Sequence, residues 1–218
     1  GLVVFGLYLL GPVLAFLSGL FLKRFLFKGE PAPFLLELPP YRMPTAKNIW
    51  LHVWQRVRDF LTRAGTIIAA MSVVVWFLQS FGPNFQMVSD TAESILARFG
   101  SFIAPIFAPL GFGAWQAAVA LLTGLIAKEA VVSSMSLFYG FSMTDYAAAG
   151  AAMAVTFSPA AALAFLVFCA LYTPCVAAIA TIRREMGSRR WTVLTLAWQL
   201  AVAYLASFVA YHLALLML

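Results

Sequence analysis

Six long runs of apolar residues alternate with polar segments along the chain. They cover residues 2–22, 64–81, 95–113, 115–139, 158–180 and 191–217. Each run is close to the length of about 20 apolar residues that a helix needs to cross a bilayer. The pattern therefore predicts an all-α, polytopic membrane protein with about six transmembrane segments, folded as a single membrane domain over 1–218.

The run 95–113 is the poorest candidate for a span, because glycine and proline interrupt it. These residues are Gly100, Pro105, Pro109, Gly111 and Gly113. Proline and glycine disfavour a long uninterrupted helix. The sequence leaves two interpretations open here, a full crossing or a re-entrant hairpin.

Basic residues bear on the topology, since twelve of the fourteen lysines and arginines lie in two clusters, within 23–63 and 183–190. The positive-inside rule places both clusters on the cytoplasmic side, so an even number of crossings separates them. Four crossings satisfy this condition. A hairpin at 95–113 would leave three, and 158–180 would then have to break at Pro174.

The segment 23–63 is expected to be cytoplasmic and to have two parts. Residues 28–48 contain five prolines, which predict an extended segment along the membrane surface. From position 49 the apolar residues recur at helical spacing: Ile49, Trp50, Val53, Trp54, Val57, Phe60 and Leu61. This pattern predicts an interfacial amphipathic helix that leads into the span at 64–81.

Composition supports a membrane protein, with 63% hydrophobic and 10% charged residues, whereas soluble domains are about a quarter charged. The net charge of +6 is explained by topology and does not indicate nucleic-acid binding. The chain has neither an initiator methionine nor the layout of a signal peptide. We therefore expect it to be part of a longer protein.

Two adjacent charges stand near the middle of the run 115–139, at Lys128 and Glu129. Ionisable residues at this depth are costly and usually functional. The Glu129 carboxylate suits a divalent cation, and Ser133 lies one helical turn further on. Gly124 allows close approach of another backbone or a break in the helix. The alternative is a structural ion pair, to a partner such as Asp145 or Arg98.

A second unusual feature is Thr173-Pro174-Cys175 inside the run 158–180. Proline has no backbone N–H to donate, so a carbonyl near Ala170 is expected to be freed. A freed carbonyl, a hydroxyl and a thiolate form a plausible site for a transition metal such as Fe(II). Cys169 is expected to be a small buried apolar residue, since its spacing from Cys175 on a helix disfavours a disulfide.

The sequence contains none of the motifs GxxxxGK[ST], HExxH or GxSxG. No catalytic constellation is visible, so the chain is not expected to be an enzyme or to hold a cofactor.

Three blocks of sequence carry a resemblance to a known family. ELPPYRMP at 37–44, GLIAKEAVVSS at 124–134 and LYTPCVAAIATIRRE at 171–185 resemble the C-terminal membrane half of the ferrous-iron transport protein B (FeoB) family. The order and spacing of the blocks match, and the resemblance covers nearly the whole chain. It implies a multi-pass protein of the bacterial inner membrane whose transported substrate is Fe(II).

The resemblance also implies partners within the same polypeptide. These are an N-terminal GTPase domain, which would bind GTP and Mg²⁺, and the first of two related gate motifs; neither is in this chain. Residues 100–200 would hold the second gate, with Cys175 and Glu129 matching its metal-path cysteine and glutamate. A homo-oligomer could replace the absent half.

The resulting hypothesis assigns a role to each site residue. Cys175 and Glu129 would bind the ion, with Thr173 and Ser133 as neutral oxygen ligands, and Lys128 would keep Glu129 ionised when the site is empty. Two alternatives stay open: a gate-type permease for an organic solute such as a nucleoside, and a non-transporting membrane assembly subunit. The second alternative predicts that Lys128 and Glu129 pair in the interior without contact with water.

Overall fold

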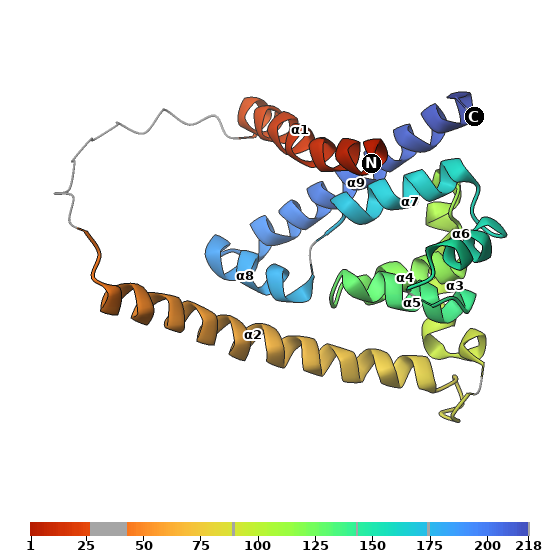
Figure 1. Ribbon diagram of the computed structural model, residues 1–218, viewed down its shortest axis with the longest axis horizontal. Helices are drawn as coiled ribbons and strands as arrows, with labels where there is room; N and C mark the ends of the chain where they lie inside the picture. The colour runs from red at the N-terminus through yellow and green to blue at the C-terminus, as the bar shows by residue number, and fades with distance from the viewer. Residues whose placement is uncertain (27–42, 89, 143, 174, 218) are drawn as a thin grey trace. The chain divides into compact units, whose positions relative to one another are not determined.

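The computed structural model describes residues 1–26, 43–88, 90–142, 144–173 and 175–217, and the regular elements in these residues are helices (Figure 1). This confirms the all-α class. The chain divides into two compact units, Gly1–Arg63 and Ala64–Leu218. Most of the proline-rich segment 28–48 lies outside the described residues, as does Pro174.

The N-terminal unit contains α1 (Leu2–Phe25) and the first half of α2 (Ala46–Ser80). Its α1 is apolar all round, and Val3–Phe25 is long enough to cross a membrane. Its last turn carries Lys23 and Arg24. In α2, six of the apolar side chains expected on an amphipathic face are exposed, and the rings of Trp50 and Trp54 stack 6.2 Å apart. The six are Ile49, Trp50, Val53, Trp54, Val57 and Leu61.

The C-terminal unit is a succession of mostly short helices. They are the 3₁₀ turn η1 (Thr91–Glu93), α3 (Ile95–Phe107), the 3₁₀ turn η2 (Ala108–Leu110), α4 (Trp115–Gly124), α5 (Glu129–Tyr139), α6 (Tyr146–Ala154), α7 (Pro159–Leu171), α8 (Val176–Met186) and α9 (Arg189–Met217). Side-chain oxygens of Ser94, Asp145 and Ser158 cap the N-termini of α3, α6 and α7. Capping satisfies amide groups that a helix start leaves without an intrahelical acceptor.

The core of this unit forms where α7 packs along α9, α3 against α4 and α4 against α5. Small residues allow close approach, since Ala164 of α7 and Ala203 of α9 are both completely buried. Two hydroxyls of α9 form hydrogen bonds to backbone carbonyls of α7 and α3. Ser207 Oγ donates to the Ala164 carbonyl at 2.7 Å, and Tyr204 donates its hydroxyl to the Ile106 carbonyl of α3 at 3.0 Å.

Two of the described helices, α1 and α9, are long and apolar enough to span a membrane, and up to four spans result if each bent helix pair counts as one. The bent pairs are α3 with α4, at 102°, and α6 with α7, at 110°. The expected span at 95–113 is α3 and η2 followed by this sharp bend.

Two of the expected spans are each divided into two helices. Residues 115–139 form α4 and α5 with a break at 125–128, and residues 158–180 form α7 and α8 with a break at 172–175. The sequence allowed for a break after Gly124 and a kink at Pro174, because glycine and proline interrupt helices, whereas apolar periodicity alone does not locate an interruption. Whether the breaks can form depends on hydrogen-bond partners that come from elsewhere in the fold.

Candidate functional site: two interrupted helices that bond to each other

The first break begins where α4 ends at Gly124. A Cβ at this position would overlap the hydroxyl of Tyr172 and the Cγ2 methyl of Val131. Only a residue without a side chain fits between α4, α5 and the end of α7. The atoms that approach Gly124 belong to side chains and not to another backbone. The chain leaves helical geometry at the next residues, which is the break that the sequence allowed.

The second break begins where α7 ends at Leu171. Thr173 is buried there, and Cys175 is half-buried at the N-cap position of α8. Cys169, expected to be a buried apolar residue, is half-buried in the last turn of α7, and both cysteines are free thiols. No disulfide joins them, as expected.

Each break supplies hydrogen-bond donors to the other. The Val176 amide, at the start of α8, donates to the Leu125 carbonyl at 2.7 Å. The Tyr172 hydroxyl donates to the Leu121 carbonyl of α4 at 3.4 Å. Backbone carbonyls at the end of a helix have no intrahelical donor, and in an apolar medium an unpaired one is costly. The two interruptions are therefore mutually stabilising.

Lys128 makes two further connections between the breaks. Its ammonium donates to the carbonyls of Cys169 and Ala170 in the last turn of α7, at 3.2 and 3.4 Å. The Nζ atom also lies 5.1 Å from the centroid of the Tyr172 ring, within cation–π range. The freed carbonyl expected near Ala170 is thus present, and it is occupied by a side chain from the other break.

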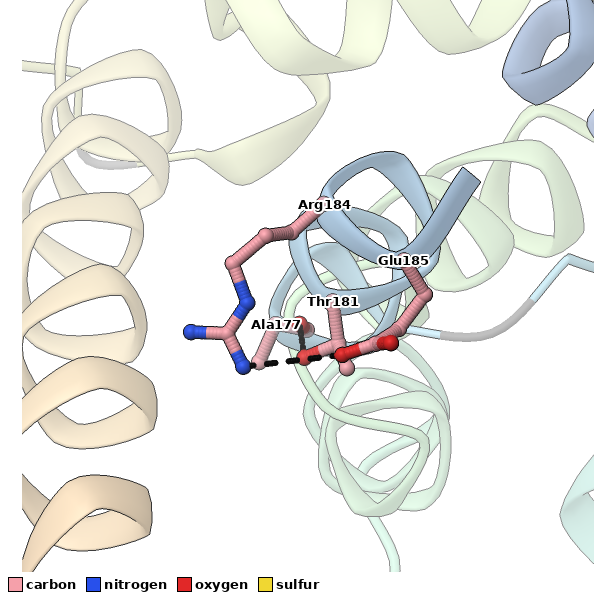
Figure 2. A network of polar contacts seen from close by, with 4 residues as sticks. All are labelled: Ala177, Thr181, Arg184 and Glu185. Carbon is pink, nitrogen blue, oxygen red and sulfur yellow. Dashed lines mark hydrogen bonds and ion pairs between the residues drawn. The ribbon is translucent and has the colours of Figure 1, made fainter. Parts of the chain in front are cut away.

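The structural ion pair considered for Lys128 and Glu129 is not observed in the described part of the chain. Asp145 instead caps α6, accepting from the Ala148 amide at 3.0 Å. The ion pair that the described residues do show joins Arg184 and Glu185 on α8, at 3.7 Å (Figure 2). Lys128 and Glu129 are both exposed, so the buried pair that an assembly subunit would require is also not seen.

Glu129 stands in the first turn of α5, where a carboxylate is favoured by the positive end of the helix dipole. Ser133 lies one turn later and donates to the Glu129 backbone carbonyl at 3.5 Å. Its neighbour Ser134 is the buried serine, and it shares a 2.8 Å hydrogen bond with Thr123 of α4. This buried pair and Tyr172 were not among the expected site residues. Tyr172 adjoins Thr173 in sequence, but nothing in the sequence indicated that it reaches α4.

Among the residues that the structure describes, no three His, Cys, Asp or Glu side chains gather to hold a metal ion. The groups near the two breaks that could coordinate a cation are of several kinds. They are backbone carbonyls, the Thr173 hydroxyl, the Cys175 thiol and the Glu129 carboxylate. Carbonyl-rich sites of this type suit cations that are bound in transit, where moderate affinity allows release.

Comparison with known proteins identifies the family. The family model described as "Ferrous iron transport protein B C terminus" matches residues 4–56, and the Gate model, described as "Nucleoside recognition", matches residues 61–189. A relative from Staphylococcus aureus (strain COL), named Fe(2+) transporter FeoB, is 41% identical over 213 residues. The chain belongs to the ferrous iron transport protein B family.

Other members of this family are similarly related. The Fe(2+) transporter FeoB of Methanocaldococcus jannaschii is 36% identical over 216 residues, and that of Campylobacter jejuni is 32% identical over 229 residues. The S. aureus alignment covers 97% of this chain but 31% of the relative, so the chain spans about a third of the relative's length. No solved structure matches the chain.

Proposed function

We propose that this chain forms part of the path by which Fe(II) crosses the bacterial inner membrane, and that the ion passes the point where the two interrupted helices meet. The observation that carries the proposal is a cation-binding position at the end of α7, which we call the seat. There the carbonyls of Cys169 and Ala170 accept hydrogen bonds from a cationic group, the Lys128 ammonium. The names of the relatives, Fe(2+) transporters, supply the identity of the ion.

The electrostatics of the two breaks support a cation over an anion. Helices α4 and α7 both end here, and each helix C-terminus carries about half a negative charge from its free carbonyls. The opposite, positive end of α5 is offset by Glu129 in its first turn. Half-helices that meet in this way are a recurrent device for binding ions near the membrane midplane.

Three of the proposed ligands, Cys175, Thr173 and Glu129, lie in or next to the two helix breaks in the sequence. Cys175 would be the soft ligand that Fe(II) accepts alongside oxygen, Thr173 a neutral hydroxyl ligand, and Glu129 a carboxylate that attracts and partly dehydrates the ion. Ser133 would contribute a second hydroxyl on the α5 side.

Several wider features complete the proposal. The chain would cross the membrane about six times, with α2 beginning as an interfacial helix whose exposed Trp50 and Trp54 lie at the headgroup level. The remaining length of the relatives would supply a GTPase domain and the first gate, which we propose as partners in the same polypeptide. A homo-oligomer is a further proposed arrangement.

Anaerobic Fe(II) uptake tests the function. Cells would carry the parent full-length protein as wild type, Cys175→Ser or Glu129→Gln, at matched membrane expression. We expect both substitutions to lower uptake strongly. Cys169→Ser is the matched control, because it removes the other thiol and leaves the Cys169 backbone carbonyl in place. Normal uptake by both Cys175→Ser and Glu129→Gln would refute the ligand roles.

The description of the Gate model as nucleoside recognition favours one other function, the uptake of an organic solute such as a nucleoside. A nucleoside does not require a thiolate ligand. Nucleoside uptake by the full-length protein that is unaffected by Cys175→Ser would support this alternative over Fe(II) transport.

A further inference from the structure

The seat at the end of α7 binds a cation, and in this structure the cation is the Lys128 ammonium. Two successive carbonyls, those of Cys169 and Ala170, accept hydrogen bonds from the Lys128 ammonium, and the ring of Tyr172 lies beneath the same Nζ atom. The carbonyl before them, that of Phe168, accepts from the Tyr172 amide and closes the last regular turn. The seat is therefore built from carbonyls in the last turn of α7, directly before the break.

The composition of the seat matches the requirements of an inorganic cation. Carbonyl oxygens at a helix C-terminus lie at the negative end of the dipole, and an aromatic face adds electrostatic attraction. Thr173 and Cys175, two of the proposed ion ligands, follow Ala170 within five residues along the chain. An ion held by these ligands would lie beside the seat and would compete for the same negative potential.

The occupant can leave without disturbing a packed core. Lys128 is exposed and belongs to the irregular segment between α4 and α5, so no packed side chain holds its long stem in place. The exposure also means that the ammonium gives up little buried contact when it moves. A like charge that stays close to an arriving divalent cation would oppose its binding.

We propose that Lys128 is a tethered cation that fills the Cys169–Ala170 seat when no ion is present, and that a divalent cation entering the site displaces its ammonium. The proposal rests on the proposed function for the identity of the ion, Fe(II). The existence of the seat rests on the contacts alone. Displacement would keep the α7 carbonyls satisfied in the empty state and would weaken ion binding enough to permit release.

The first experiment tests the seat without iron. Purified full-length protein would carry Lys128→Ala, and its thermal unfolding midpoint would be measured with increasing ethylammonium chloride against sodium chloride at equal ionic strength. We expect ethylammonium to restore part of the midpoint lost in Lys128→Ala, because it replaces the missing ammonium. Lys47→Ala, which removes a lysine from the start of α2, is the control and should show no restoration. Absence of any ethylammonium effect on Lys128→Ala would overturn the seat.

The second experiment tests displacement. Anaerobic equilibrium binding of Fe(II) would be compared between the wild-type full-length protein, Lys128→Met and Lys47→Met. Methionine keeps the apolar stem and removes the charge, so we expect Lys128→Met to bind Fe(II) at least tenfold more tightly, with Lys47→Met unchanged. Equal or weaker binding by a folded Lys128→Met protein, as judged by its unfolding midpoint, would overturn displacement and leave Lys128 as a simple helix cap.

The two experiments separate this inference from the proposed function. Loss of the Cys175 and Glu129 roles in the uptake assay would not alter ethylammonium restoration, which depends only on the carbonyls of α7. A second outcome is that ethylammonium restores the midpoint of Lys128→Ala while neither the wild-type protein nor Lys128→Met binds Fe(II). This outcome would support the seat, but it would overturn displacement by Fe(II) and count against the proposed function.

Discussion

The close approach at Gly124 allows a quantitative test of how the two breaks hold together. Replacement of Gly124 by alanine adds one methyl group at the end of α4. That methyl would overlap the Tyr172 hydroxyl and Val131 Cγ2. One of the two side chains must then move, and movement of Tyr172 also weakens its hydrogen bond to the Leu121 carbonyl.

The expected magnitude follows from three contributions. Overpacking in a close-packed interior costs about 1–3 kcal/mol, and loss of one hydrogen bond costs about 0.5–1.5 kcal/mol. Alanine in place of glycine in a helix returns about 1 kcal/mol. We therefore expect a net destabilisation of about 0.5–3.5 kcal/mol. For a unit of this size, each kcal/mol lowers the unfolding midpoint by about 2–4 °C.

The measurement is the thermal unfolding midpoint of the purified protein in detergent. The matched control is Gly150→Ala in α6, where nothing lies within 4 Å of the added Cβ, so this substitution should be neutral or slightly stabilising. The double variant Gly124→Ala with Tyr172→Phe should recover part of the loss, because it removes the overlapping hydroxyl. Equal midpoints for Gly124→Ala and Gly150→Ala would refute the close packing of the two breaks.

Two further substitutions test the packing around α9 by the same measurement. Gly111→Ala should lower the unfolding midpoint more than Gly187→Ala. Both glycines have positive φ, 82° and 60°, but only at Gly111 would the new methyl overlap a side chain, the Tyr211 ring. Similar midpoints for the two variants would contradict that contact. Ser207→Ala should lower stability by about 0.6–1.7 kcal/mol, because it removes a buried 2.7 Å bond between helices. Ser101→Ala, which removes a bond within α3 alone, should cost less, and an equal loss in both would show that the interhelical bond contributes nothing specific.

Much of the helical content and part of the site were predictable from the sequence. The apolar runs at 2–22 and 191–217 correspond to α1 and α9, because a stretch of this length and hydropathy has few stable forms other than a helix in a membrane. Lys128 and Glu129 were also conspicuous, since charges inside an apolar run are rare. Gly124 and Pro174 indicated where a helix is open to interruption, because their effect on the backbone is local.

Tertiary structure decided what each of these residues contacts. In the described part of the chain, the adjacent charges Lys128 and Glu129 do not form an ion pair with each other: one reaches the carbonyls of α7 and the other stands in the first turn of α5. Neither the partner of Lys128 nor the reach of Tyr172 to α4 is encoded in local spacing, because each contact joins segments more than 40 residues apart. Hydropathy and propensity determine where helices form, whereas the satisfaction of carbonyls at a helix break depends on which other segment the fold brings beside it.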